Sequence, residues 1–310
     1  MHIRHVVPAI AVLAVIGAAA PATPAASSPT PAAPSDSRQF MIHAAETESA
    51  AFLQYAGYAD GALRSGRRDL ADVWQTVGQV EHQDHWMHEV TQAGLYSATD
   101  NAANVRTAIE QAGHAAKAYA RWATQAPENS AAAAELRAAA ARETAAAHLL
   151  TQALTALRSG GKIPDPPSVR TVPVQVSNAP LHTGSFYNVL TGDSNSALST
   201  AARNWAEYQS HAQTAVNTGQ ARLAALFSAL AAQERYQNWA GLSNAAGYVN
   251  SEATNLKTSI ASEQEAINMY TRYADEAQKA GDTTAADFFR EAGGDEVGHQ
   301  RSFRQLTGSS

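Results

Sequence analysis

Two acidic residues and a histidine near the end of the chain have the spacing of a metal-binding set. Glu296 and His299 are three positions apart in a stretch of helical character, so both side chains would point to one side of a helix. Glu263 precedes them across a Gly281-Asp282 break, which predicts two helices folded back as a hairpin. Four-helix bundles that hold two irons use a Glu from each of two helices and a Glu-x-x-His from each of the other two. One hairpin of this chain carries both halves of that pattern.

The same pattern recurs along the chain as an internal repeat. An offset of 215 positions relates the C-terminal hairpin to an earlier copy that contains Glu48, Tyr55, Gly66 and Glu81. A third copy is offset from that one by 153 positions and contains Tyr208, Gly219 and Glu234. The weakest copy lies near 104–157, where alignment on Tyr119 brings His148 to the histidine position and Ala112 and Ala145 to the glutamate positions. Four copies predict four helical hairpins, or eight helices.

The C-terminal hairpin resembles the rubrerythrin branch of the ferritin-like superfamily. The matching residues are Glu263, Tyr270, Tyr273, Ala274, Gly281, Phe289, Glu296 and His299. The resemblance implies an all-α fold, a diiron centre, and oxidation of ferrous iron by peroxide or oxygen; manganese is the alternative metal. The chain has no cysteine, so it lacks the four-cysteine rubredoxin iron site of typical rubrerythrins, and an external reductant would be needed.

Changes in composition and stretches rich in Pro, Gly and Ser divide the chain into five segments. Residues 1–22 have the basic head, apolar run and small-residue cleavage site of a secretory signal peptide, which predicts a secreted or cell-surface protein without a membrane span in its mature form. Residues 23–37 are rich in Pro, Ala, Ser and Thr and predict a disordered tether. We expect two tandem ferritin-like four-helix bundles, 38–158 and 196–308, separated by a linker over 159–195 in which Thr171–Val176 is extended.

In the expected C-terminal bundle, four of the six usual ligand positions are filled. Glu263, Glu296 and His299 come from the last hairpin, and Glu234 comes from the third. The third hairpin departs from the pattern, because Ala201 stands at its first glutamate position and Gln237 at its histidine position. This bundle would therefore hold a lopsided site, a single metal, or none.

In the expected N-terminal bundle, Glu48 and Glu81 are in place and Asp84 occupies the histidine position. His85 or His88 could supply the missing imidazole one turn further along, and His148 could come from the second hairpin. The repeated tyrosines would lie in the bundle cores with their hydroxyls bonded to neighbouring carboxylates, at Tyr55, Tyr208 and Tyr270.

A bundle without metal explains the same residues in a different way. Each buried glutamate would bond to a tyrosine, arginine or glutamine, and the protein would serve as a binding or structural module at the cell surface or outside it. The formal charge of −6 and the absence of a Lys/Arg run argue against a nucleic-acid partner. Phosphate-binding loops, nucleophile elbows and His-Glu-x-x-His motifs are also missing from the sequence.

Overall fold

The computed structural model describes residues 35–128, 130–178, 185–192 and 195–307, and its regular structure in these ranges is entirely helical. The expected signal peptide and nearly all of the expected tether lie outside the described residues. The first helix begins at Ser35, which is inside the range predicted as tether. None of the described helices combines the length and apolar character needed to cross a membrane.

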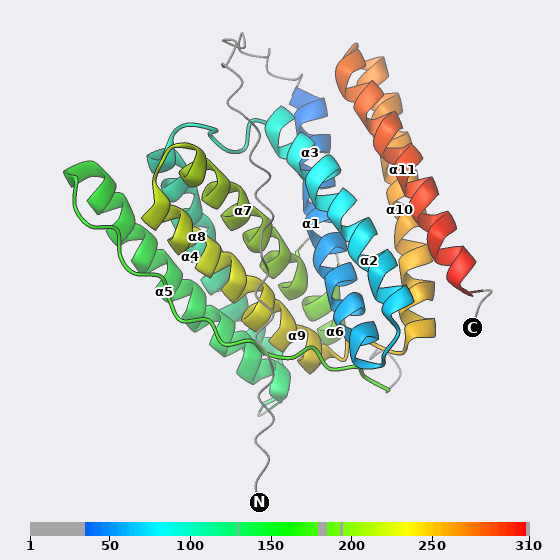
Figure 1. Ribbon diagram of the computed structural model, residues 1–310, viewed down its shortest axis with the longest axis horizontal. Helices are drawn as coiled ribbons and strands as arrows, with labels where there is room; N and C mark the ends of the chain where they lie inside the picture. The colour runs from blue at the N-terminus through cyan, green and yellow to red at the C-terminus, as the bar shows by residue number, and fades with distance from the viewer. Residues whose placement is uncertain (1–34, 129, 179–184, 193–194, 308–310) are drawn as a thin grey trace, which may run out of the picture. The chain divides into compact units, whose positions relative to one another are not determined.

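The described helices form four hairpins, which confirms the all-α prediction (Figure 1). The first hairpin joins α1 (Ser35–Arg64) to a continuous helix composed of α2 (Arg68–Val80), η1 (Glu81–Trp86) and α3 (Met87–Gln92). The second joins α4 (Asn101–Gln125) to α5 (Ala131–Ser159). The third joins α7 (Ala197–Asn217) to α8 (Ala221–Gln233), η2 (Glu234–Trp239) and α9 (Ala240–Ala246). The fourth joins α10 (Glu252–Lys279) to α11 (Thr283–Thr307), and a short helix, α6 (Ser185–Thr191), precedes α7.

Glycine sets three of the four hairpin turns. Gly66, Gly219 and Gly281 have φ values of 81°, 74° and 80°, a left-handed conformation that a side chain would strain. The helices that follow other connections begin at capping residues instead. For example, the side chains of Ser196 and Ser251 accept hydrogen bonds from backbone N–H groups three residues on, at the starts of α7 and α10.

The hairpins pair in a nested order that differs from the expected tandem order. Helix α1 packs against α10, and α2 contacts α11, so the first hairpin shares a bundle with the fourth. Helix α4 packs against α7 and α5 against α9, so the second hairpin shares a bundle with the third. We call these the outer bundle (α1, α2–α3, α10, α11) and the inner bundle (α4, α5, α7, α8–α9). Figure 1 shows the blue and cyan helices beside the orange and red ones, with the green and yellow helices together.

Connection lengths explain this pairing. The segment between α5 and α7, residues 160–196, is long enough to run the length of a bundle, and it joins the two hairpins of the inner bundle. The segments 93–100 and 247–251 are shorter, and they lead from one bundle to the other. Part of the long connection is pinned in place, since Val172 N–H donates to Tyr236 O and Ser177 N–H donates to Val249 O, both at 2.8 Å. The run Thr171–Val176 has no regular secondary structure.

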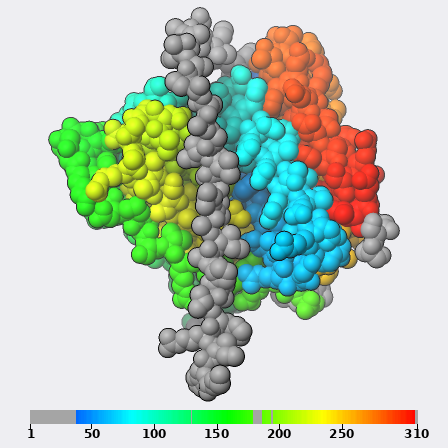
Figure 2. Space-filling view, viewed as in Figure 1, coloured from blue at the N-terminus to red at the C-terminus, as the bar shows by residue number. Residues whose placement is uncertain are grey.

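One continuous core of buried side chains extends through both bundles, and a second, smaller cluster packs the start of α1 against α10 and α11. The two bundles meet mainly through α1 and α7, where the rings of Phe52 and Trp205 stack with centroids 4.2 Å apart. Gly57 allows a second close contact, because a side chain at this position would overlap the indole of Trp239. The inner bundle is thus inserted in the sequence between the two hairpins of the outer bundle, and in space it packs beside them (Figures 1 and 2).

Candidate metal centre

Six side chains of the outer bundle converge on one buried centre. Their potential ligand atoms form two groups, each with all atoms within 4.8 Å of one another. The first group is Glu48, Glu81, His85 and Glu296, and the second is Glu81, Glu263, Glu296 and His299. Glu81 and Glu296 belong to both groups, so the arrangement offers two adjacent metal positions joined by two shared carboxylates.

The two histidines occupy matching places across this centre. His85 Nδ1 lies 3.1 Å from a Glu81 oxygen and 3.2 Å from a Glu296 oxygen. His299 Nδ1 lies 3.1 Å from the other Glu296 oxygen and 3.2 Å from the other Glu81 oxygen. Metal–ligand bonds of about 2.1 Å at right angles place neighbouring ligand atoms about 3 Å apart, so these separations suit a shared cation.

A π-helical segment explains why His85, rather than Asp84, faces the centre. Residues 81–86 form η1, whose wider turns bring the residue four positions after Glu81 to the side that the third occupies in an α-helix. His85 is consequently buried, while Asp84 is exposed. The placement of Asp84 at the histidine position was therefore wrong. In α11 the spacing from Glu296 to His299 keeps its α-helical form.

Each of the remaining carboxylates is held by a tyrosine from the opposite hairpin. The hydroxyl of Tyr55 donates to Glu263, and the hydroxyl of Tyr270 lies 2.6 Å from Glu48 Oε1. These two contacts confirm the expected partners of both tyrosines. Tyr270 also lies 2.8 Å from Glu89 Oε1, a fully buried carboxyl that sequence reasoning missed. One hydroxyl cannot donate to two carboxylates, so the Glu48–Tyr270–Glu89 set must hold an additional proton.

The centre contains more acidic than basic side chains, with four glutamates and two histidines. Burial, and then the neighbouring carboxylates, raise the pKa of Glu48 well above its usual value and that of Glu263 to about 12. Burial opposes protonation of the histidines, but hydrogen bonds to Glu296 and Glu81 outweigh it and raise the pKa of His85 to about 12 and that of His299 to about 9. Without a metal, the centre therefore retains protons that the unfolded chain would release.

The donor set fits a pair of divalent cations. Four carboxylates bring four negative charges, which two divalent ions balance while both imidazoles become neutral ligands. The second ring nitrogen of His85 lies 3.4 Å from the exposed carboxylate of Asp295, an arrangement that orients metal-binding histidines. Oxygen and imidazole donors without thiolate are typical of iron or manganese sites rather than of structural zinc.

The inner bundle has a buried polar cluster at positions that correspond to those of the centre. Glu234 does not join the outer site as expected; it faces Glu143 of α5, and the amide of Asn238 donates to both carboxyls at 2.8 and 2.9 Å. Asn238 occupies the repeat position of His85. Its amide N–H groups bond to the two carboxyls of the inner bundle, whereas the carboxylates of the outer centre would need a cation between them. Burial first, and then mutual repulsion, raises the pKa of Glu143 well above its usual value. Ala201 stands at the position of Glu48 and Ala112 at that of Glu263, and both are fully buried.

Several other expected site residues lie elsewhere. His148 is exposed on α5, because α5 is shifted by two positions from the expected register and its buried glutamate is Glu143, two positions before Ala145. His88 stacks on Phe288 with ring centroids 4.0 Å apart and takes no part in the centre. Gln237 is half-buried in η2, and Tyr208 is buried in the inner bundle without a hydrogen-bond partner for its hydroxyl among the described residues.

Comparison with known proteins identifies one part of the chain. The family model described as rubrerythrin matches residues 245–309, a range that includes the whole of α10 and α11. This segment is therefore rubrerythrin-like, as the residues quoted above indicated. The match covers the hairpin that contributes Glu263, Glu296 and His299 to the centre. No curated protein and no solved structure matches the chain.

Proposed function

We propose that this protein binds two iron ions in the outer bundle and catalyses oxidation of ferrous iron by peroxide or oxygen. The observation that carries the proposal is the pair of four-residue groups that share Glu81 and Glu296. A single-metal site would need only one of these groups. The rubrerythrin-like character of residues 245–309 supports iron as the metal, because the resemblance implies iron binding.

When bound, a ferrous pair supplies two electrons, which is the number that cleavage of the peroxide O–O bond consumes. The residues of the chain position this chemistry. Glu81 and Glu296 set the spacing of the two metal positions, and Tyr55 and Tyr270 restrain the terminal carboxylates. Burial excludes bulk water from the centre, which strengthens each electrostatic interaction within it.

The protons that peroxide reduction consumes have sources beside the centre. Tyr270 joins Glu48 to Glu89, and burial raises the pKa of Glu89 to about 8. His85 lies between the buried carboxylates and the exposed Asp295, which places a polar path from solvent at the opposite edge. We assign proton delivery to these two groups of residues.

We further propose that the protein acts outside the cytoplasm, on the strength of the signal-like segment at residues 1–22. The absence of cysteine from the chain excludes a built-in rubredoxin site, so a separate molecule supplies electrons for turnover.

Metal content tests the proposal directly. We expect about two irons per chain after anaerobic reconstitution with ferrous iron, and an absorbance change when peroxide is added. Glu296→Ala should remove both irons, because Glu296 belongs to both groups. Glu291→Gln is the matched control, since Glu291 is an exposed glutamate on the same helix and should leave the iron content unchanged. A reconstituted protein that holds no iron would refute the proposal and favour a metal-free binding module.

A further inference from the structure

A series of oxidisable aromatic rings leads away from the metal centre. It begins at Tyr55, whose hydroxyl donates to Glu263. The ring centroids of Tyr55 and Tyr58, both on α1, are 6.5 Å apart, and the Tyr58 ring stacks on that of Tyr248 at 6.3 Å. Tyr248 in turn meets Trp239 of η2 edge-on at 6.1 Å. These separations are those of aromatic side chains in contact, so the four rings form a continuous series, which we call the aromatic path.

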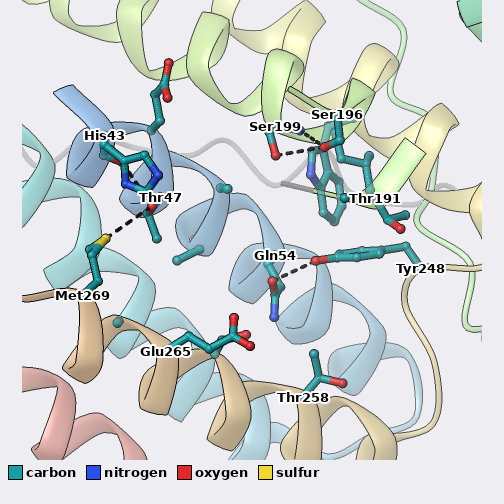
Figure 3. A pocket seen from close by; sticks show the side chains of 18 of the residues that line it. His43, Thr47, Gln54, Thr191, Ser196, Ser199, Tyr248, Thr258, Glu265 and Met269 are labelled. Carbon is teal, nitrogen blue, oxygen red and sulfur yellow. Dashed lines mark hydrogen bonds between the residues drawn. The ribbon is translucent and has the colours of Figure 1, made fainter. Parts of the chain in front are cut away.

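The aromatic path ends at a cavity of about 520 Å³ between the two bundles (Figure 3). Helices α1 and α10 form one wall of this cavity, and residues of α6, α7 and η2 form much of the other. Tyr248 and Trp239 belong to the lining, and Figure 3 shows the Tyr248 hydroxyl directed at Gln54, to whose Oε1 it donates at 2.8 Å. Tyr55 and Tyr58 are fully buried and do not line the cavity. A small molecule in the cavity therefore contacts the outer half of the path but not the inner half.

Two tyrosines bond to carboxylates of the centre, but only Tyr55 begins such a path. Tyr270 is its repeat equivalent on α10, and Tyr273 is the equivalent of the next tyrosine. The described ring contacts connect Tyr270 to Tyr273 through Phe289, with centroid separations of 6.1 and 5.5 Å. Phenylalanine lacks the phenol or indole group that makes tyrosine and tryptophan readily oxidised. The series that starts at Tyr55 is therefore the better conductor of electrons.

The reaction proposed above needs more electrons than the centre itself holds when oxygen is the oxidant. Reduction of oxygen to two water molecules takes four electrons and four protons, whereas a ferrous pair supplies two electrons. A reductant in solution has little direct access to the centre, because His299, the most exposed of its six side chains, is only 12% exposed. The remaining electrons must therefore cross the protein.

We propose that the aromatic path conducts electrons one at a time from the cavity to the iron centre. Tyr248 and Trp239 each give up one electron at the cavity, and Tyr58 and Tyr55 pass these electrons on through ring contact. A small one-electron donor that enters the cavity then restores the two outer residues. This inference rests on the proposed function, because it describes how electrons reach the iron centre of that function.

The step balances in atoms and in charge. Tyr248 loses one electron and its hydroxyl proton, Trp239 loses one electron and its indole proton, and both protons pass to solvent. Oxygen takes up these two electrons, two electrons from the ferrous pair and four protons from solvent. Its O–O bond breaks, two water molecules form, and two ferric ions and two neutral radicals remain. Each radical then gains one electron and one proton from the donor, for which ascorbate serves as the probe.

Radicals in the iron-loaded protein test the path. The ferrous protein is mixed with oxygen in the absence of a reductant and frozen rapidly for EPR, and a second portion is digested to locate oxidised residues by mass spectrometry. We expect a tyrosyl or tryptophanyl signal, and stable oxidation products at Trp239 that require both iron and oxygen. Ascorbate, when present from the start, should abolish both.

Tyr58→Phe removes the middle carrier and should abolish most of the oxidation at Trp239, because Tyr55 then has no oxidisable ring through which to reach Tyr248. Tyr273→Phe is the matched control, since Tyr273 stands at the same repeat position in the fourth hairpin and lies outside the path. It should leave the oxidation of Trp239 unchanged. Both variants should keep the iron content of the unaltered protein. Equal oxidation of Trp239 in the two variants would overturn the inference.

The outer half of the path is tested without iron. Azide radicals generated by pulse radiolysis oxidise tryptophan in the metal-free full chain, and the absorbance of the tryptophanyl radical should decay as that of a tyrosyl radical rises. Tyr248→Phe should reduce the fast part of this transfer, because Tyr248 is the one tyrosine in ring contact with Trp239 among the described residues. Tyr236→Phe is the control, since Tyr236 also lies on η2 but contacts no indole ring in the described part of the chain.

The two proposals fail in different ways. Unchanged radical transfer in Tyr248→Phe would refute the path whatever the iron content of the protein. Failure of the proposed function would instead appear as missing iron in elemental analysis, whether or not the metal-free protein transfers an electron between Trp239 and Tyr248.

Discussion

The π-helical register of η1 makes a prediction that separates two adjacent residues. His85→Ala removes one of the four side chains of the first metal group and none of the second. We therefore expect this variant to hold about one iron per chain instead of two. Asp84→Ala removes an exposed side chain from the same turn and should retain both irons. Glu81→Ala removes a carboxylate that both groups share, and should retain neither.

The thermal stability of the protein should report the same difference. Free ferrous iron at 100 times the dissociation constant of each position stabilises the folded state by about 2.7 kcal/mol per ion, or about 5 kcal/mol for two ions. For a folded body of this size, that corresponds to a rise in melting temperature of about 10 °C. His85→Ala should show about half of this rise, and Asp84→Ala the full rise.

Differential scanning calorimetry with and without ferrous iron, on each variant, provides the assay. Comparing each variant with its own metal-free form cancels any loss of packing that the substitution itself causes. The outcome that would refute the reasoning is the reverse pattern, in which Asp84→Ala loses iron and His85→Ala keeps two ions. That result would mean that residues 81–86 follow an ordinary α-helical register when metal is bound.

Three further substitutions, the last with a matched control, test the packing and charge of the two bundles. The pKa of Glu143 is raised by burial, so folding takes up a proton above about pH 4.5 and the free energy of unfolding falls as pH rises. In urea unfolding, Glu143→Gln should therefore gain stability at pH 8 and none near pH 4, and equal effects at the two pH values would contradict this. Burial lowers the pKa of His82 to about 4, so between about pH 6.5 and pH 4 only the unfolded chain binds a proton at this residue, and the free energy of unfolding falls as pH falls. His82→Phe should remove up to about 3 kcal/mol of this acid-induced loss of stability, and an unchanged acid profile would contradict this. Gly57→Ala should lower the free energy of unfolding by about 1 to 3 kcal/mol, because the added methyl group meets Trp239. Its control, Gly113→Ala, places a methyl group in open space and should raise the free energy of unfolding by about 0.5 to 1 kcal/mol. Equal effects of the two substitutions would show that the contact between Gly57 and Trp239 is loose.

Much of the fold was predictable from the repeat. Glutamate, tyrosine and glycine at fixed intervals predicted four hairpins, and the structure contains them with three glycines in the expected turns. The partner of each hairpin was not predictable from that repeat, because four copies of one pattern are compatible with more than one pairing. A signal was nevertheless present. At the repeat positions, only the first and last hairpins carry two glutamates with a histidine close to the second, so only their pairing brings together a complete set of metal-ligand side chains.

The composition of the centre was partly predictable for a related reason. Five of its six side chains stand at repeat positions that the sequence indicates as metal ligands: Glu48, Glu81, Glu263, Glu296 and His299. His85 was one of two alternatives, because a one-residue bulge in a helix changes which side chain faces inward and leaves little trace in composition. Glu89 lies outside the repeat, so its burial beside Tyr270 could not be inferred from it.

The insertion of the inner bundle between the two halves of the outer one has a consequence during synthesis. Glu48, Glu81 and His85 leave the ribosome long before Glu263, Glu296 and His299 exist. Until the last hairpin emerges, the early half of the centre has no partner, and the intervening helices must first bring the distant ends of the chain together. A nascent or truncated polypeptide therefore lacks half of the side chains of the centre, so we expect metal to be bound only after the whole chain has been made.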